Sequence, residues 1–137
     1  MKRILVSSTD VMMYLFLIPH INRLVNSNYQ VDVACSSADE YKAEGYEQII
    51  REQLPENSQY FHISSERSPY SRANIKGYNE LRSIIKDNNY DLVWTNEPVM
   101  GVITRLAAYQ FRKKGLKVLY LAHGYHFFKG APILNWI

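Results

Sequence analysis

The sequence has 137 residues, enough for one domain with a single hydrophobic core. Apolar residues make up 47% and charged residues 21% of the chain, which is typical of a globular protein and argues against intrinsic disorder. The net charge is only +3 and the basic residues are scattered, so the composition does not indicate a nucleic-acid-binding protein.

The single cysteine, Cys35, excludes an internal disulfide and fits a reducing cytoplasm. It ends an apolar run, so we expect a buried small side chain rather than a nucleophile. The apolar block Val11–Ile18 has eight residues, whereas a helix that spans a bilayer needs about 20. The amino-terminal segment also lacks a small-residue cleavage site, and the sequence therefore predicts neither a signal peptide nor a transmembrane helix.

Short apolar runs predict five β-strands. Four of them are almost continuously apolar, as expected for strands buried on both faces of a sheet, and the third is more polar. The predicted strands are Arg3–Ser8, Gln30–Cys35, Gln59–Ser64, Asp91–Thr95 and Lys117–Ala122.

Amphipathic segments between these runs predict helices. Asp39–Leu54 is ended by Pro55, and Asn74–Asp87 has one apolar face. Val99–Lys114 ends in a basic turn followed by a glycine, which is a typical helix stop. Its core-facing side is expected to carry Val102, Ile103, Leu106, Ala107 and Gln110. The corresponding side of Asn74–Asp87 is expected to carry Ile75, Tyr78, Leu81, Ile84 and Ile85.

The first helix is less regular. Thr9 or Asp10 could cap its start, and Asn26–Asn28 ends it before the second strand. Pro19 either kinks one long helix or opens a shorter one at its first position.

Alternation of strands and helices predicts an α/β fold with a doubly wound, Rossmann-like parallel sheet. Ligands bind such sheets beyond the carboxyl ends of the strands, where the strand order reverses, commonly between the first and fourth strands. The loops expected at a ligand site are therefore Ser7–Asp10, Thr95–Pro98 and His123–Pro132.

The first of these loops contains no phosphate-binding pattern. It reads VSSTDV, without the glycines of G-x-G-x-x-G, and no P-loop occurs elsewhere, which argues against a dinucleotide site. Its hydroxyls and Asp10 could hydrogen-bond a hydroxylated ligand, or Thr9 or Asp10 could simply cap the helix.

Polar residues also follow the third and fourth strands. Glu97 could act as a base or bind hydroxyls together with Asn96, or Asn96 could cap the next helix while Glu97 complements its dipole. Arg67 and Arg72, after the third strand, are candidates for contacts with an anionic ligand.

The last loop, LAHGYHFFKGAP, carries more polar and glycine residues than a turn requires. His123 and His126 are three residues apart without a third metal ligand nearby, so we predict no metal site. A neutral His123 imidazole that hydrogen-bonds a ligand is one interpretation, and a structural histidine is the other. Gly124, Lys129 and Gly130 favour the functional one.

One run of basic residues stands out from the scattered charge. It is explained either as the solvated end of a helix or as a contact with an anionic membrane surface. The run comprises Arg112, Lys113, Lys114 and Lys117.

The segments ERSPYSRANIKGYNELRSIIKDNNYDLVWTNEPVMGVITRLAA and VLYLAHGYHFFKGAPILNW closely resemble the N-terminal domain of family 4 glycosyltransferases. The nearest group is the bacterial capsule and exopolysaccharide transferases. The resemblance covers nearly the whole chain and is strongest over Glu66–Trp136. Its most specific part is the run A-H-G-Y-H-F-x-K-G-A-P-x-x-N-W, Ala122–Trp136.

This resemblance implies a GT-B architecture, in which two Rossmann-like domains face each other across a cleft. Residues 1–137 would be the acceptor-side domain, and a C-terminal domain absent from this sequence would bind the nucleotide-sugar donor. The implied reaction is retaining sugar transfer, without metal or other cofactor, to a lipid-linked saccharide at the cytoplasmic face of the membrane. Peripheral membrane attachment would accompany it.

The resemblance also assigns site residues. His123 would be the catalytic residue that contacts the transferred sugar, and Gly124 would let the backbone approach that sugar. The other residues expected to bind substrate are Asp10, Arg67, Asn96, Glu97, His126 and Lys129.

Departures from the family pattern leave the acceptor open. Many relatives have Asp-Ser-His after the first strand and His-x-His-Thr-Pro after the fourth, where this sequence has Asp10-Val11-Met12 and Trp94-Thr95-Asn96-Glu97-Pro98. Without a donor domain we expect no activity from residues 1–137 alone, and exposed apolar residues in Pro132–Ile137 would favour self-association. A non-catalytic subunit of a split, membrane-associated transferase is the alternative. A flavodoxin-type nucleotide module is disfavoured because no phosphate loop is present.

Overall fold

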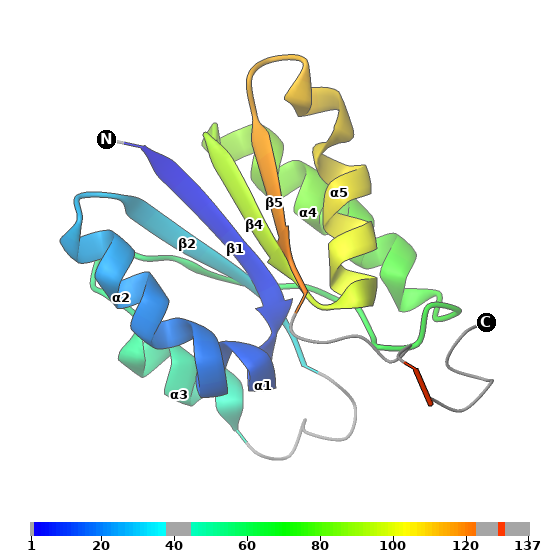
Figure 1. Ribbon diagram of the computed structural model, residues 1–137, viewed down its shortest axis with the longest axis horizontal. Helices are drawn as coiled ribbons and strands as arrows, with labels where there is room; N and C mark the ends of the chain where they lie inside the picture. The colour runs from blue at the N-terminus through cyan, green and yellow to red at the C-terminus, as the bar shows by residue number, and fades with distance from the viewer. Residues whose placement is uncertain (1, 38–44, 123–128, 131–137) are drawn as a thin grey trace.

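The computed structural model describes residues 2–37, 45–122 and 129–130 (Figure 1). In this part of the chain, five parallel strands form one sheet in the order β3-β2-β1-β4-β5, so the order reverses between β1 and β4 as predicted. The strands are β1 (Arg3–Thr9), β2 (Gln30–Ser36), β3 (Tyr60–His62), β4 (Leu92–Asn96) and β5 (Lys117–Leu121). The predicted doubly wound α/β fold is confirmed.

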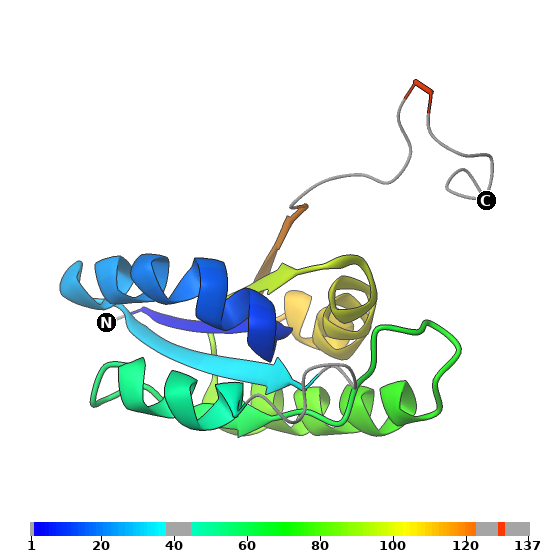
Figure 2. The ribbon, with the colours of Figure 1, turned by 90° about the horizontal axis from the view of Figure 1, so that it is seen from below.

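Helices cover both faces of the sheet. Their bounds are α1 (Asp10–Met12), the π-helix η1 (Met13–Leu17), α2 (Ile18–Asn26), α3 (Tyr46–Gln53), α4 (Ala73–Asn88) and α5 (Pro98–Arg112). Figure 1 shows α4 beside α5, and Figure 2 shows α2 and α4 on opposite sides of β1. Each helix layer packs on its own apolar cluster, because alternate residues of the central strands point to opposite faces.

The first cluster joins β1 and β2 to α1–α3. Its buried members are Ile4, Val6, Met13, Leu17, Ile18, Ile21, Val31, Val33, Cys35 and Ile50. The second joins the other face of the sheet to α4 and α5, through Leu5, Ala34, Ile63, Leu81, Ile85, Tyr90, Val93, Met100, Ile103, Ala107, Ala108 and Leu116.

The first helix combines the two alternatives for Pro19. One helical rod runs from Asp10 to Asn26, but its middle turn, Met13–Leu17, is a π-helix and Pro19 is the second residue of α2. A proline ring crowds the carbonyl four residues earlier, here that of Leu15, and the wider π turn makes room for it. Thr9 is the N-cap residue of the rod by its backbone, but its side chain makes no capping bond.

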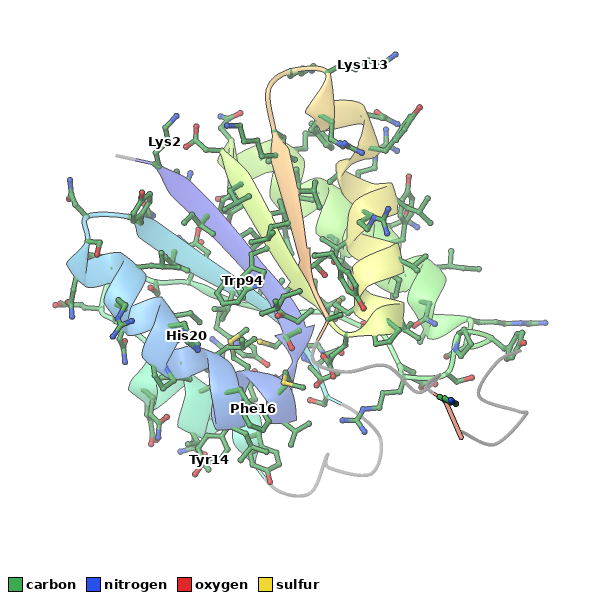
Figure 3. The ribbon with its side chains drawn as sticks, viewed as in Figure 1. Lys2, Tyr14, Phe16, His20, Trp94 and Lys113 are labelled. Carbon is green, nitrogen blue, oxygen red and sulfur yellow. The ribbon has the colours of Figure 1, made fainter. Side chains whose placement is uncertain are left out.

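The exposed face of this rod carries aromatic side chains (Figure 3). Phe16 is 55% exposed. Tyr14 lies 5.2 Å from the Tyr46 ring of α3, and His20 lies edge-on to Trp94 of β4 at 6.3 Å. These contacts fix the rod on α3 and on the sheet.

Several element boundaries and faces differ from the sequence predictions. The helix predicted from Asp39 is described only from Tyr46, and Gly45, with φ 68°, precedes it as the N-cap residue. Residues 38–44 lie outside the described part. β3 is three residues long. β5, predicted to be buried on both faces, is largely exposed because it lies at the edge of the described sheet.

The buried face of α5 is also rotated from the predicted one. Ile103 and Ala107 are buried as expected, but Val102 and Leu106 are 57% and 59% exposed. The smaller residues of α5 face the sheet instead. The Tyr120 ring of β5 packs so closely against Gly101 that a Cβ added to this glycine would lie 2.7 Å from the ring. On α4, Ile75 is likewise 67% exposed. The pattern was misread because small residues such as Gly101 carry little hydrophobic signal.

A polar network closes the amino end of the sheet. The fully buried Asp32 accepts hydrogen bonds from Tyr90 Oη (2.7 Å) and Gln59 N (3.0 Å) and pairs with Arg3 at 3.2 Å. Burial, and then the bond to Asp32, raise the pKa of Tyr90. The Arg3 backbone N–H donates to Asp91 (2.8 Å) and lowers the pKa of that carboxyl.

Candidate functional site at the strand-order reversal

Polar side chains meet at the carboxyl ends of β1, β2 and β4, where the strand order reverses. Thr9 ends β1 and Asp10 follows it, Ser37 follows β2, and Asn96 ends β4 with Glu97 directly after it. Parallel strands bring these chain segments to the same edge of the sheet. We call this group the switch-point cluster.

Glu97 ties the end of β4 to the end of β1. Its carboxylate accepts hydrogen bonds from Ser8 Oγ (2.9 Å), the Thr9 backbone N–H (2.7 Å) and Thr9 Oγ1 (2.8 Å). Both carboxylate oxygens are therefore engaged by the protein itself. Glu97 is also the N-cap residue of α5, so its carboxylate lies at the start of that helix while its hydrogen-bond partners belong to β1.

The backbone at Glu97 is unusual. It has φ 69° and ψ 149°, a region that is nearly exclusive to glycine. The following Pro98 favours this extended ψ but does not account for the positive φ. Strained residues cluster at functional sites, so the conformation marks the switch-point cluster as a candidate site.

Asp10 is the second carboxylate of the cluster. It is 3% exposed and accepts hydrogen bonds from Ser37 Oγ and Tyr60 Oη, both at 2.6 Å. Burial is the main cause of the raised pKa of Tyr60, with Cys35 and the bond to Asp10 adding to it. Asp10 also lines a hollow of about 370 Å³ that reaches Arg51 of α3.

Asn96 lies fully buried beneath these groups. Its Nδ2 donates to the Ser7 carbonyl (3.2 Å), while Ser7 Oγ lies 2.9 Å from Thr104 Oγ1 of α5. The N-cap residue of α5 is Glu97 rather than Asn96, and the Glu97 side chain makes no capping hydrogen bond. Within the described ranges, the buried Thr95 Oγ1 and Trp94 Nε1 have no hydrogen-bond partner. Cys35 is fully buried, which confirms the prediction of a buried small side chain, and burial is the first cause of its raised pKa.

The structure thus brings together three of the predicted site residues, Asp10, Asn96 and Glu97. Arg67 is exposed in the loop before α4, and Lys129 is exposed in the described segment 129–130. His123, Gly124 and His126 lie outside the described residues, and their roles stay predictions.

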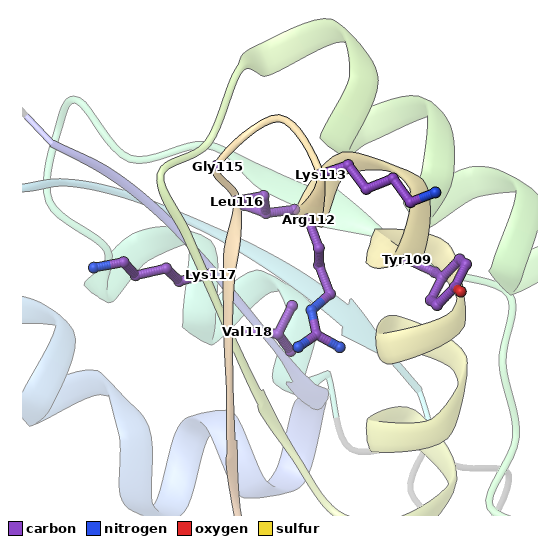
Figure 4. Close-up of a pocket in the computed structure, with 7 residues that line it drawn as sticks. All are labelled: Tyr109, Arg112, Lys113, Gly115, Leu116, Lys117 and Val118. Atoms are coloured by element: carbon purple, nitrogen blue, oxygen red, sulfur yellow. The ribbon is translucent and has the colours of Figure 1, made fainter.

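The basic run lies at the other end of the sheet. Arg112, Lys113 and Lys117 line a hollow of about 660 Å³ between the end of α5 and the start of β5. Figure 4 shows Lys113 and Lys117 pointing in opposite directions, while Arg112 extends toward Val118. The run is therefore separate from the switch-point cluster.

Sequence reasoning missed an apolar groove between α4 and α5. The groove, about 910 Å³ in volume, is lined mainly by apolar and aromatic side chains. Its signal in the sequence was the set of apolar residues on the predicted helix faces, which we assigned to the core instead. The lining residues are Pro69, Tyr70, Ser71, Arg72, Asn74, Ile75, Tyr78, Pro98, Val99, Val102, Ile103, Leu106, Tyr109 and Gln110.

Comparison with known proteins identifies the family. The profile of the "Glycosyl transferase 4-like" family matches residues 3–137. The chain belongs to this family. It is 36% identical, over 99% of its length, to the Bacillus subtilis (strain 168) protein named "Putative glycosyltransferase EpsD". It spans 32% of that protein, so it corresponds to about a third of its curated relative.

Solved structures agree on the fold. MurG from Acinetobacter baumannii superimposes with a TM-score of 0.64 at 15% identity, covering 89% of this chain and 35% of MurG. The UDP-GlcNAc 2-epimerase from Methanocaldococcus jannaschii has a TM-score of 0.59 at 17% identity, covering 98% of this chain and 35% of the epimerase. At these identities the likeness shows the fold alone, a doubly wound Rossmann-like α/β domain.

The described residues include no helix that is both long and apolar enough to cross a bilayer. Among the same residues there is no group of three or more metal-ligating side chains.

Proposed function

We propose that this domain is the acceptor side of a retaining glycosyltransferase that moves a sugar from a nucleotide-sugar to a lipid-linked saccharide in exopolysaccharide synthesis. The observation that carries the proposal is the family match over residues 3–137, supported by 36% identity to EpsD. The donor would be bound outside these residues, by another segment or a partner chain. The reaction would take place at the cytoplasmic face of the membrane.

The switch-point cluster supports a role in binding a neutral, hydroxyl-rich ligand. Carboxylates and hydroxyls crowd the turn after β1, and these groups can donate to and accept from sugar hydroxyls. Asp10 is held by two donors and keeps lone pairs for a third, because an ionised carboxylate offers about four acceptor positions.

The proposed roles divide between the described cluster and the loop after β5. Asp10 would accept from an acceptor hydroxyl, while Asn96 and Glu97 would hold the turn that presents it. Arg67 and Lys129, both exposed, would contact the anionic part of the acceptor, and His126 would hydrogen-bond the acceptor sugar. His123 would hydrogen-bond the transferred sugar as a neutral imidazole, and Gly124 would leave room for that sugar. In a retaining transfer, the acceptor hydroxyl bonds to the anomeric carbon on the face from which the nucleotide leaves.

The test is a transfer assay with the complete gene product that contains these residues. A panel of UDP-sugars is offered with a farnesyl-diphosphate-linked monosaccharide, and NMR reports the anomeric configuration of the product. We expect transfer with retention, lost in His123→Ala and kept in the matched control His20→Ala, whose ring packs outside the site against Trp94.

Transfer with inversion, or no transfer with any donor, would refute the proposal. Transfer that appears only after a separate donor-domain protein is added would instead show a binding subunit of a split enzyme.

A further inference from the structure

We infer that the groove between α4 and α5 holds the apolar chain of the lipid-linked acceptor, while its saccharide lies at the switch-point cluster. This inference rests on the proposed function and adds to it the orientation of the acceptor. It assigns a lipid-binding role to a surface that contains none of the switch-point residues and that borders the second core cluster.

The groove has the size and lining of a site for an apolar ligand. Its volume of about 910 Å³ lies within the roughly 300–1,000 Å³ of small-molecule sites. Five large apolar side chains on or beside it are more than half exposed. They are Tyr70 (94%), Ile75 (67%), Val102 (57%), Leu106 (59%) and Tyr109 (64%).

The groove begins one residue after the switch-point cluster along the chain. α5 begins at Pro98, which lines the groove, and Pro98 directly follows Glu97 of the cluster. The groove runs along α5 from Pro98 to Gln110, about 18 Å at 1.5 Å per residue. A ligand could therefore leave its polar end at the cluster and extend an apolar chain between the two helices.

The charged residues at the turn after β1 and at the groove indicate where the diphosphate of the ligand lies. At the turn after β1, the Thr9 backbone N–H already donates to Glu97, and Asp10 adds a second buried carboxylate. Such a turn disfavours a phosphate, because like charges repel in a poorly hydrated site. Arg72, by contrast, is exposed and lines the groove at its mouth, before α4. The diphosphate that joins saccharide to lipid fits there, between the polar cluster and the apolar groove.

A hydrogen bond bridges the two helices at the far end of the groove. Arg82 of α4 donates to Gln110 of α5 at 2.9 Å, on the surface, where the apolar lining ends. We therefore place the polar end of the ligand at the other end, where α5 begins next to Glu97.

The experiment measures binding of two probes by the complete gene product. Farnesyl diphosphate carries the apolar chain and the diphosphate without a sugar, and N-acetylglucosamine 1-phosphate carries sugar and phosphate without the chain. Leu106→Asp places a charge in the groove, and Leu15→Asp is the matched control on η1, with 55% exposure against 59% for Leu106. Val102→Asn is a second groove variant for the case in which Leu106→Asp does not fold.

We expect the groove variant to weaken farnesyl diphosphate binding at least tenfold and to leave sugar phosphate binding unchanged, while Leu15→Asp changes neither. Arg72→Gln should weaken farnesyl diphosphate but not farnesol. Equal binding by Leu106→Asp and Leu15→Asp would overturn the inference. A loss confined to binding of anionic lipid vesicles would also overturn it and would make this face a bilayer contact. Groove-dependent binding without sugar transfer would refute the proposed function and leave the groove assignment standing.

Discussion

The hydrogen bonds of Glu97 predict a specific order of stability among its variants. Glu97→Ala removes the acceptor for the Thr9 N–H and for two hydroxyls. Thr9 is 5% exposed, so the N–H loses its partner away from water, which costs about 1–3 kcal/mol. The hydroxyls can rotate toward other partners, and we add about 1 kcal/mol for the two bonds together. The expected loss of unfolding free energy is therefore about 2–4 kcal/mol.

Glu97→Gly separates these bonds from the backbone strain. It loses the same bonds, but glycine adopts φ 69° without the Cβ clash that costs other residues about 1–2 kcal/mol. The greater conformational entropy of glycine in the unfolded chain offsets about 0.4–1 kcal/mol of this stabilisation. Glu97→Gly should thus be more stable than Glu97→Ala by about 1 kcal/mol. Glu97→Gln keeps one oxygen for the Thr9 N–H and should be the mildest change.

Urea unfolding followed by far-UV circular dichroism measures all three free energies. The reasoning fails if the alanine variant lies within about 0.5 kcal/mol of the parent protein, the range of ordinary surface substitutions. It also fails if the glycine variant is no more stable than the alanine variant, since the positive φ would then carry no strain.

Three further predictions concern the rest of the fold. Gly101→Ala should change the unfolding free energy by less than about 1 kcal/mol, because the new Cβ would lie 2.7 Å from the Tyr120 ring and turning that ring away offsets the better helix propensity of alanine. In a Tyr120→Ala background the same substitution should stabilise the protein by about 0.5–1 kcal/mol. The Arg3 N–H lowers the pKa of Asp91 in the folded protein, so the Asp91 carboxylate stabilises the fold above its unfolded pKa. This stabilisation is lost as the pH falls through the lower folded pKa. The urea midpoint should therefore vary less between about pH 2 and pH 5 in Asp91→Asn than in the parent protein. The Cys35 thiol, buried and with a raised pKa, should react with a thiol reagent at pH 8 only after urea unfolds the protein, and rapid labelling of the folded protein would contradict its placement.

Much of the fold was predictable because its signals are local. The apolar runs located β1, β2, β4 and β5 to within a residue or two, and the strand–helix alternation gave the parallel sheet and its reversal point. The carboxyl ends of β1 and β4 were predicted to be neighbours, and Asp10, Asn96 and Glu97 were therefore expected at one edge of the sheet. The prediction that β5 is buried on both faces was wrong, because an apolar strand has the same sequence pattern whether or not other elements cover it.

The contacts within the site could not be predicted in the same way. Glu97 reaches residues 88 and 89 positions earlier, and its positive φ is unexpected for a glutamate. The sequence indicated that Asp10 could meet a ligand, but not that Ser37 and Tyr60 would hold it. Such contacts depend on the order and register in which β1, β2, β3 and β4 pair in the sheet, and the periodicity of the sequence does not encode either of them.

The position of Glu97 connects the polar and apolar halves of the proposed site. In many parallel α/β folds, the backbone N–H groups of the turn after the first strand bind a phosphate. Here the Thr9 N–H donates to the carboxylate of Glu97, which directly follows β4, so an anion would have to displace Glu97 from three donors. One residue later, Pro98 starts α5 and lines the apolar groove. Glu97 thus occupies the N–H that a phosphate would use and directly precedes the first residue of the groove. The order of surfaces along the chain fits a ligand with a neutral head, an anionic linker and an apolar tail.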